Sequence, residues 1–246
     1  MKAIAIYNFK GGVGKTAASV NLAYEAALSG QKTLLWDLDP QGASSFYFRI
    51  KPKIKGDAKR LLTKTAKALD QIKATDYANL DLLPADLSYR EMDIVLDDLK
   101  RSKKRFAPLF EVLESEGYET LLIDCPPGLT LVSENAMIAS DLIASPIIPT
   151  PLSLRAFDQM VKHAKTLGVK KERFAPFFSM VDRRKGLHRE VVDSFVAEHK
   201  ALTSVIPYLS SVERMGISRE PVAAFEPRSG AARAYRLLLE EIEALL

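Results

Sequence analysis

Short apolar runs alternate with amphipathic segments along almost the whole chain. The apolar runs predict buried strands at 3–7, 32–39, 79–85, 117–127, 142–148, 173–181 and 203–207. Between them, apolar residues recur at helical spacing, which predicts helices at 17–28, 51–73 and 154–167, helical segments across about 89–116, and a closing helix after the N-cap candidate Ser229. Strands that alternate with helices are typical of parallel sheets. We therefore predict a doubly wound, mostly parallel α/β sheet with helices on both faces.

The size and composition fit one globular domain spanning residues 1–246. Of these residues 47% are hydrophobic, and a chain of this length can bury a large core. Cys125 is the single cysteine, so an intramolecular disulfide is excluded, and the sequence shows no secretory signal or apolar run of ~18 residues. We therefore expect a cytoplasmic protein. The formal charge of +4 is compatible with a polyanionic partner without requiring one.

A glycine-rich loop separates the first predicted strand from the first predicted helix. It reads Lys10-Gly11-Gly12-Val13-Gly14-Lys15-Thr16. Glycines allow backbone angles that are closed to other residues, so successive N–H groups and the helix N-terminus face an anionic phosphate together. In such a loop Lys15 reaches the β- and γ-phosphates and the Thr16 hydroxyl binds Mg²⁺. The sequence therefore predicts a nucleotide site at the end of the first strand.

Carboxylates end two further predicted strands. Asp37 and Asp39 close the second strand, where alternating side-chain directions place both on one side. Asp124 ends a later apolar strand. In an open α/β sheet the carboxyl ends of the strands face the ligand crevice, and carboxylates suit Mg²⁺ and its waters. We expect these acids beside the phosphates; a solvated strand end before a turn is the alternative reading of Asp37 and Asp39.

The glycine loop resembles the deviant Walker A motif, K-G-G-x-G-K-[ST], of the ParA/MinD group of ATPases. Three further segments carry the resemblance: 37–42 matches D-x-D-P-Q-G, 79–85 resembles N-L-x-L-L-P-A, and 226–235 resembles a C-terminal S-x-G-A-x-A-Y segment. The strand ending in Asp124 looks like Walker B, and 126–128 looks like a switch segment that senses the γ-phosphate. The resemblance is closest to small ParA proteins without an N-terminal DNA-binding domain, so we do not expect operator-specific autoregulation.

This resemblance implies a doubly wound P-loop ATPase fold and a role for each residue near the phosphates. Lys10 would reach across a nucleotide-sandwich dimer to the partner's phosphates, and Lys15 would bind the phosphates of its own site. Asp39 would orient or activate the attacking water. Thr16, Asp39 and Asp124 would hold Mg²⁺ directly or through water.

The resemblance also implies where the rest of the nucleotide lies. The loop and the first helical residue, 10–17, would contact the phosphates. The ends of two late strands would wall the adenine, which gives Met180, Asp182 and Pro207 as candidates. The sequence has no N-K-x-D guanine motif, so we expect ATP rather than GTP.

By the same resemblance, the expected activity is slow ATP hydrolysis. ATP would close a homodimer, the dimer would bind nonspecific DNA on the nucleoid, and a ParB-like or adaptor protein would stimulate hydrolysis. The cargo, whether a plasmid, a chromosome or a protein assembly, is not encoded in any motif. Three positions depart from the family pattern, at Phe9, at Ala17, and at Tyr208, where arginine is frequent at a DNA contact.

Basic residues late in the chain are the candidates for DNA contact. They are Arg183, Arg184, Lys185, Arg189, Arg214, Arg219 and Arg228. Each alone is compatible with a solvated surface charge, but two copies in a dimer would form a continuous basic face. The basic segments at 51–73 and 100–105 are interpreted first as solvated faces, with nucleic-acid or partner contact as the alternative.

Two other function classes remain open. A MinD-like ATPase would bind membranes through its C-terminal helix, but the segment at 237–246 is amphipathic and acidic, so anionic lipids would repel it and we expect no stable membrane association. A metabolic or metal-inserting P-loop enzyme would need a substrate constellation. His163, His188 and His199 lack a spacing typical of metal sites, and one cysteine cannot hold the cluster of a nitrogenase iron protein. We interpret Cys125 as a small buried residue.

Overall fold

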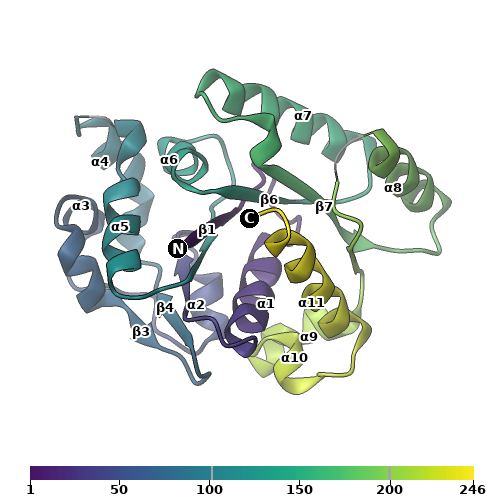
Figure 1. Ribbon diagram of the computed structural model, residues 1–246, viewed down its shortest axis with the longest axis horizontal. Helices are drawn as coiled ribbons and strands as arrows, with labels where there is room; N and C mark the ends of the chain where they lie inside the picture. The colour runs from purple at the N-terminus through teal and green to yellow at the C-terminus, as the bar shows by residue number, and fades with distance from the viewer. Residues whose placement is uncertain (101, 199–200) are drawn as a thin grey trace.

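The computed structural model describes residues 1–100, 102–198 and 201–246; Arg101 of the predicted basic run and His199 lie outside the described residues. In the described part, eight strands form one sheet in the order β3-β4-β2-β5-β1-β6-β7-β8 (Figure 1). Their bounds are β1 Lys2–Ile6, β2 Thr33–Asp37, β3 Lys73–Ala74, β4 Leu80–Leu83, β5 Thr120–Asp124, β6 Leu142–Ile147, β7 Phe174–Val181 and β8 Val205–Pro207. Among these described strands, only the short β3 pairs antiparallel with its neighbour, so the predicted mostly parallel sheet is confirmed.

Strand β1 lies near the middle of the sheet, between β5 and β6, and its register with β5 aligns the strand ends. Ile6 pairs with Asp124 of β5, and Asp37 at the end of β2 pairs with the same Asp124 from the other side. Because these strands are parallel, the loops that follow them leave the sheet at one edge. The glycine loop and the two acidic segments therefore lie together.

Helices cover both faces of the sheet (Figure 1). Helices α1, α9, α10 and α11 contribute buried side chains to one apolar cluster, and α3 to α8 contribute to a second cluster on the opposite face. The α-helices are α1 Lys15–Leu28, α2 Ala43–Tyr47, α3 Ala58–Thr63, α4 Met92–Asp97, α5 Ala107–Ser115, α6 Leu131–Ala139, α7 Pro151–Thr166, α8 Gly186–Glu198, α9 Ser210–Ser218, α10 Val222–Phe225 and α11 Gly230–Glu243. Short 3₁₀ turns are η1 Thr65–Gln71, η2 Leu87–Glu91, η3 Ser102–Lys104 and η4 Lys171–Arg173.

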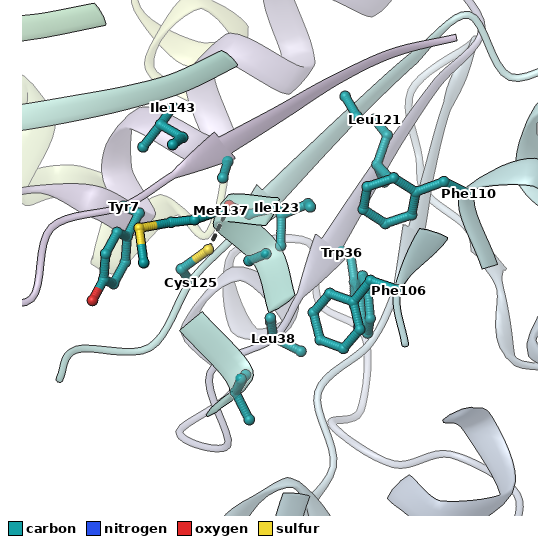
Figure 2. Close-up of a cluster of buried hydrophobic side chains, with 14 of the residues drawn as sticks. Tyr7, Trp36, Leu38, Phe106, Phe110, Leu121, Ile123, Cys125, Met137 and Ile143 are labelled. Atoms are coloured by element: carbon teal, nitrogen blue, oxygen red, sulfur yellow. Dashed lines mark hydrogen bonds between the residues drawn. The ribbon is translucent and has the colours of Figure 1, made fainter. Parts of the chain in front are cut away.

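One of the two clusters contains the buried aromatic side chains of Tyr7, Trp36, Phe106 and Phe110 (Figure 2). Trp36 of β2 packs against Phe106, with ring centroids 4.7 Å apart. Full burial of such a side chain contributes about 1.5–3 kcal/mol to folding. Cys125 lies in the same cluster, 1% exposed, and its thiol donates to the carbonyl of Ile123. The interpretation of Cys125 as a small buried residue is confirmed.

One long predicted helix, at 51–73, is interrupted, so that prediction was wrong in extent. The segment at 51–73 forms α3 and the 3₁₀ turn η1, because Lys64 between them adopts a non-helical backbone conformation. The helical segments predicted across 89–116 are confirmed as η2, α4, η3 and α5. Pro108 lies in the first turn of α5, where a missing N–H is tolerated, and in the interior of a longer helix it would break the hydrogen-bond ladder. By contrast, Ser229 caps α11 as predicted, accepting from the amide of Ala232.

Candidate nucleotide-binding site

The glycine loop joins β1 to α1 as a phosphate cradle. Gly12 and Gly14 have φ values of 71° and 92°, which residues with a side chain rarely adopt. Helix α1 begins at Lys15, directly after Gly14, so its unpaired N-terminal amides border the loop. A Cβ atom at Gly14 would lie 2.7 Å from the Oγ of Ser179 on β7. Gly14 is therefore required both for its backbone conformation and for the close approach of β7.

Side chains from β1 and its loop hold the cradle in place. The buried Asn8 donates to the carbonyl of Pro146 and accepts from the amide of Lys10, with both distances 2.9 Å. The Tyr7 hydroxyl donates to the carbonyl of Gly128 in the predicted switch segment, at 2.7 Å. The amide of Gly128 donates in turn to the carbonyl of Phe9. The phosphate loop and the switch segment are thus linked by two hydrogen bonds, and the departure at Phe9 leaves that backbone contact intact.

Lys15 points back into its own loop. Its ammonium donates to the carbonyl of Lys10 at 2.8 Å, and the residue is 7% exposed. Burial lowers the pKa of Lys15, and the nearby carboxylate of Asp124 opposes that shift. An anionic phosphate in the cradle would give this buried ammonium a charged partner in place of a carbonyl.

Asp124 and Asp37 form a pair of buried carboxylates at the ends of adjacent strands. Asp124 accepts from the hydroxyls of Ser19 at 3.1 Å and Ser44 at 2.8 Å. Asp37 accepts from the amide and hydroxyl of Ser45 through one oxygen, while its Oδ1 atom has no partner among the described residues. Burial and the neighbouring charge of Asp124 raise the pKa of Asp37 to about 8, and burial raises the pKa of Asp124 to about 6.

The predicted strand face shared by Asp37 and Asp39 is not observed, because β2 ends at Asp37. Asp37 is fully buried, whereas Asp39 is half-buried and accepts from the amide of Gln41 at 2.9 Å. After Asp37 the chain leaves the strand, and Asp39 lies at the start of the turn that follows. Asp37 therefore belongs to the buried polar network, and Asp39 is the acid open to solvent.

The donor set fits Mg²⁺ better than a metal that needs an all-protein cage. Among the described residues, no three or more His, Cys, Asp or Glu side chains are grouped as a metal site would require. Mg²⁺ usually takes one or two carboxylates and completes its octahedron with waters and substrate phosphates. Here the buried Asp124 lies near the Thr16 hydroxyl, which opposes the rise in the pKa of its carboxyl. These are oxygen donors of the kind Mg²⁺ prefers.

A small apolar pocket of about 110 Å³ lies beside the loop at the ends of β7 and β8. Its lining includes Met180 and Pro207, two of the three predicted adenine contacts, together with Gly14, Ala17, Ser179, Ile206, Tyr208, Leu209, Val212, Glu213 and Tyr235. The third candidate, Asp182, is not among the lining residues, and its carboxylate pairs with the guanidinium of Arg184 at 2.9 Å. Tyr208, where the sequence departs from the family pattern, thus lines the pocket itself.

The predicted DNA contacts lie on three segments. Arg183, Arg184 and Lys185 follow β7, and Arg189 lies on α8; all four are exposed. Arg214 on α9 pairs with Glu226 at 3.5 Å, and Arg228 is exposed just before α11. Arg219 differs from the others because its guanidinium lies over the ring of Phe46, 4.5 Å from the centroid. Its charge already has a partner within the fold.

Sequence reasoning missed the hydroxyls and amides that hold the site. Ser44 and Ser45 follow the acidic motif directly, and Ser19 is one helical turn after Lys15. Each serine lies within a few residues of a recognised motif, and that proximity could have identified it as a site residue. Asn8 precedes the loop by two residues; one of its hydrogen bonds is to the nearby Lys10 amide, and the other is to the carbonyl of Pro146 on β6, far away in the sequence.

The buried acids predict a pH dependence of stability. A raised carboxyl pKa means that the folded protein keeps a proton that the unfolded chain, with a pKa near 4, has released. The free energy of unfolding of the nucleotide-free protein should therefore rise as the pH falls from about 8 to about 5, by up to roughly 1.4 kcal/mol per pH unit for Asp37. Urea unfolding of the wild type and of Asp37→Asn across this range measures the difference. Parallel pH profiles for the two proteins would contradict the assignment.

Comparison with known proteins places this site in a family. A family model described as an AAA domain matches residues 1–175. The sporulation initiation inhibitor protein Soj of Bacillus subtilis is 32% identical over 254 residues, which cover 99% of this chain and 98% of Soj. The chromosome partitioning protein ParA of Caulobacter vibrioides is 30% identical over 250 residues, which cover 98% of this chain and 94% of ParA.

A solved structure shares the fold at lower identity. Cobyrinic acid a,c-diamide synthase from Mycobacterium smegmatis, crystallised with an ATP analogue and magnesium, superposes with a TM-score of 0.82 at 21% identity, over 99% of this chain and 94% of that one. The fold alone therefore does not separate a synthase from a partition ATPase; the full-length similarity to Soj and ParA does. None of the helices in the described residues combines the length and hydropathy needed to cross a bilayer. On the family match and these relatives, the chain belongs to the ParA/MinD group of P-loop ATPases.

Proposed function

We propose that this protein is a ParA-like ATPase that binds ATP and Mg²⁺ and uses ATP-dependent dimerisation and DNA binding to position a cargo. The observation that carries the proposal is the glycine loop, in which the buried Lys15 ammonium donates to the Lys10 carbonyl and lies in the field of the Asp124 carboxylate. Full-length similarity to a chromosome partitioning ParA supports the positioning role. A partner of the ParB or adaptor type would stimulate hydrolysis, and the expected place of action is the cytoplasm, on the nucleoid.

The geometry supports catalysis by positioning and charge stabilisation. The amides of the glycine loop and the Lys15 ammonium bind the phosphates, and Lys15 gives up its contact with the Lys10 carbonyl to do so. Thr16 and Asp124 would hold Mg²⁺, which when bound neutralises charge developing on the phosphate oxygens. Asp39, half-buried and at the rim, is the carboxylate placed to orient a water. The pocket at Met180 and Pro207 would take the adenine.

Replacing Lys10 with alanine should reduce ATP-dependent dimerisation. In the proposed dimer, the Lys10 ammonium of each protomer neutralises phosphate charge in the other site, as an arginine finger does. Its backbone carbonyl, which holds Lys15, is unaffected by the substitution. Light scattering with a slowly hydrolysed ATP analogue should show a dimer for the wild type and mainly a monomer for Lys10→Ala, while both bind nucleotide. Equal dimer content in the two proteins would show that Lys10 does not act on the nucleotide of the other protomer.

DNA binding should require ATP, ignore sequence and weaken steeply with salt. Two copies of the basic face double the phosphate contacts, and a complex with 6–10 such contacts loses roughly 10³–10⁵ in affinity between about 50 and 200 mM salt. Charge reversal at two exposed positions, Arg189→Glu and Arg228→Glu, should weaken binding and lower the salt slope. Lys162→Glu on α7 is a charge-matched control. Fluorescence anisotropy with unrelated duplexes measures each effect.

The ATP-loaded protein also distinguishes the proposed DNA-binding role from a membrane-binding or a metabolic one. If ATP-loaded protein leaves duplex DNA unbound at low salt and sediments with anionic liposomes, a MinD-like membrane role replaces the proposed one. The exposed tail of α11 is acidic around Glu240 and Glu243, so anionic lipids would repel it. If neither DNA nor liposomes respond to ATP, a metabolic P-loop enzyme becomes the better reading.

A further inference from the structure

Helix α2 connects the predicted water-orienting turn to both buried carboxylates. It begins just after Asp39 and Gly42, and its first turn carries Ser44 and Ser45. The Ser44 hydroxyl donates to Asp124 at 2.8 Å, and the Ser45 amide and hydroxyl donate to Asp37 at 2.7 and 2.6 Å. The position of α2 thus decides which oxygens of Asp124 remain available for other partners.

Helix α2 is too short to hold that position unaided. It has five residues, begins without a side-chain cap, and is not followed by a second helical turn. Isolated helices of this length are unstable, so its geometry depends on tertiary contacts at both of its faces. The inner face has the two carboxylates, and the outer face carries Phe46, which is 45% exposed.

Arg219, the C-cap of α9, clamps that outer face. Its guanidinium lies 4.5 Å from the centroid of the Phe46 ring, and its Nε donates to the Phe46 carbonyl at 3.0 Å. The chain just beyond α2 is tied to the same place, because Arg49 donates to the Arg219 carbonyl and to Glu220, both at 3.2 Å. Arg49 is itself anchored by Asp76 at 2.7 Å. Two arginines therefore fasten the segment 46–49 to the end of α9.

The opposite end of α9 lies at the small apolar pocket beside the glycine loop. Val212 and Glu213 line this pocket together with Gly14 of the phosphate loop. The nine-residue helix α9 thus contacts the apolar pocket at its start. At its end, Arg219 contacts α2, the helix that carries the serines bound to the two carboxylates.

We propose that Arg219 is a positioning residue of the nucleotide site, which holds α2 from the outside and so keeps Ser44 on Asp124 and Ser45 on Asp37. The proposal rests on the proposed function for its link to Mg²⁺–ATP. It also assigns Arg219 a task other than the DNA contact expected from its charge alone. Loss of Arg219 loosens α2, and the carboxylate that is to hold Mg²⁺ loses its fixed orientation.

Hydrogen exchange of the nucleotide-free protein tests the positioning directly. In Arg219→Ala, the amides of Ser45 and Phe46 should exchange about five- to tenfold faster, as expected when a cation–π contact and one hydrogen bond are removed from a local opening unit. The amides of β5 should exchange at the wild-type rate. Phe46→Leu, a conservative change at a partly exposed site, should give the same local pattern because it removes the ring but keeps apolar contact. Arg219→Lys should restore part of the protection, since lysine keeps the charge but not the Nε contact.

Metal-dependent binding of a fluorescent ATP analogue provides the second measurement. Arg219→Ala should lower the apparent affinity for Mg²⁺, at fixed analogue, by about tenfold, and change the affinity for the analogue in EDTA by less than about twofold. The double variant Arg219→Ala/Phe46→Leu should be no weaker than the worse single variant, because the two side chains act as one contact. Arg60→Ala removes an exposed arginine from α3 and is the matched control.

Unchanged exchange at Ser45 in Arg219→Ala, or an effect of the same size in Arg60→Ala, would overturn the positioning role. Equal losses of affinity with Mg²⁺ and in EDTA would also overturn it, since they indicate a general structural defect. A wild-type protein that binds no analogue would refute the proposed function instead, and the exchange comparison would still decide on Arg219.

Discussion

Lys15→Ala should lower the rate of ATP hydrolysis at least about a hundredfold, the usual cost of removing one preorganised charge from a phosphoryl-transfer or oxyanion site. The structure holds the Lys15 ammonium in a buried position, 7% exposed, between the Lys10 carbonyl and the field of Asp124. A buried cation interacts with phosphate in a low dielectric, so water cannot replace it. Phosphate release under single-turnover conditions measures the effect even where the basal rate is slow.

Companion variants sharpen this result. Asp39→Ala should also slow hydrolysis while leaving nucleotide affinity near the wild-type value, because in the proposed mechanism Asp39 orients water and does not bind phosphate. Lys162→Ala removes an equal charge from the exposed face of α7 and should hydrolyse ATP at the wild-type rate. Unchanged turnover in both Lys15→Ala and Asp39→Ala would exclude the two residues from the site.

Gly14→Ala should weaken ATP binding about a hundredfold through two additive causes. A residue with a side chain at the φ of 92° found here costs roughly 1–2 kcal/mol, and forcing a methyl group into a packed contact costs about 1–3 kcal/mol. The new Cβ would lie 2.7 Å from Ser179 Oγ, so either the loop or β7 has to move. Gly14 belongs to the glycine loop and also lines the small apolar pocket, so either movement disturbs both parts of the site.

Removing the clashing atom tests the steric cause. Ser179→Gly in the Gly14→Ala background deletes the hydroxymethyl group and should recover part of the lost affinity, leaving the backbone cost. Gly186→Ala is the matched control, because a Cβ there meets no atom within 4 Å and its φ is not in the left-handed region. Isothermal titration calorimetry measures the affinity for an ATP analogue in the wild type, Gly14→Ala, the double variant and Gly186→Ala. Full affinity in Gly14→Ala would show that the loop adapts without penalty and would contradict the argument.

The sequence by itself determined the architecture and the phosphate cradle, because both depend on local chemistry. Apolar runs bounded by turns produced strands within a few residues of their predicted ends, and the glycines around Lys15 admit backbone angles that few other sequences allow. Acids at strand ends could be assigned to one edge because parallel strands share a direction. The fold and the family were therefore predictable before any contact was known.

Tertiary structure decided which polar groups meet. The helix predicted at 51–73 is divided at Lys64, where local backbone geometry overrides a continuing amphipathic pattern. The two acids of the second strand were separated into a buried Asp37 and an open Asp39, because the chain turns after β2.

The contact between Arg219 and Phe46 shows the physical reason. Arg219 and Phe46 are 173 residues apart in the chain, yet the guanidinium and the ring are in contact. A periodic pattern reports which face of an element is apolar, but a hydrogen bond or a stacked cation requires two groups within a few ångströms in a fixed direction. Only the packing of α9 against α2 sets that distance, so the sequence identified Arg219 as a charge and the fold determined what the charge holds.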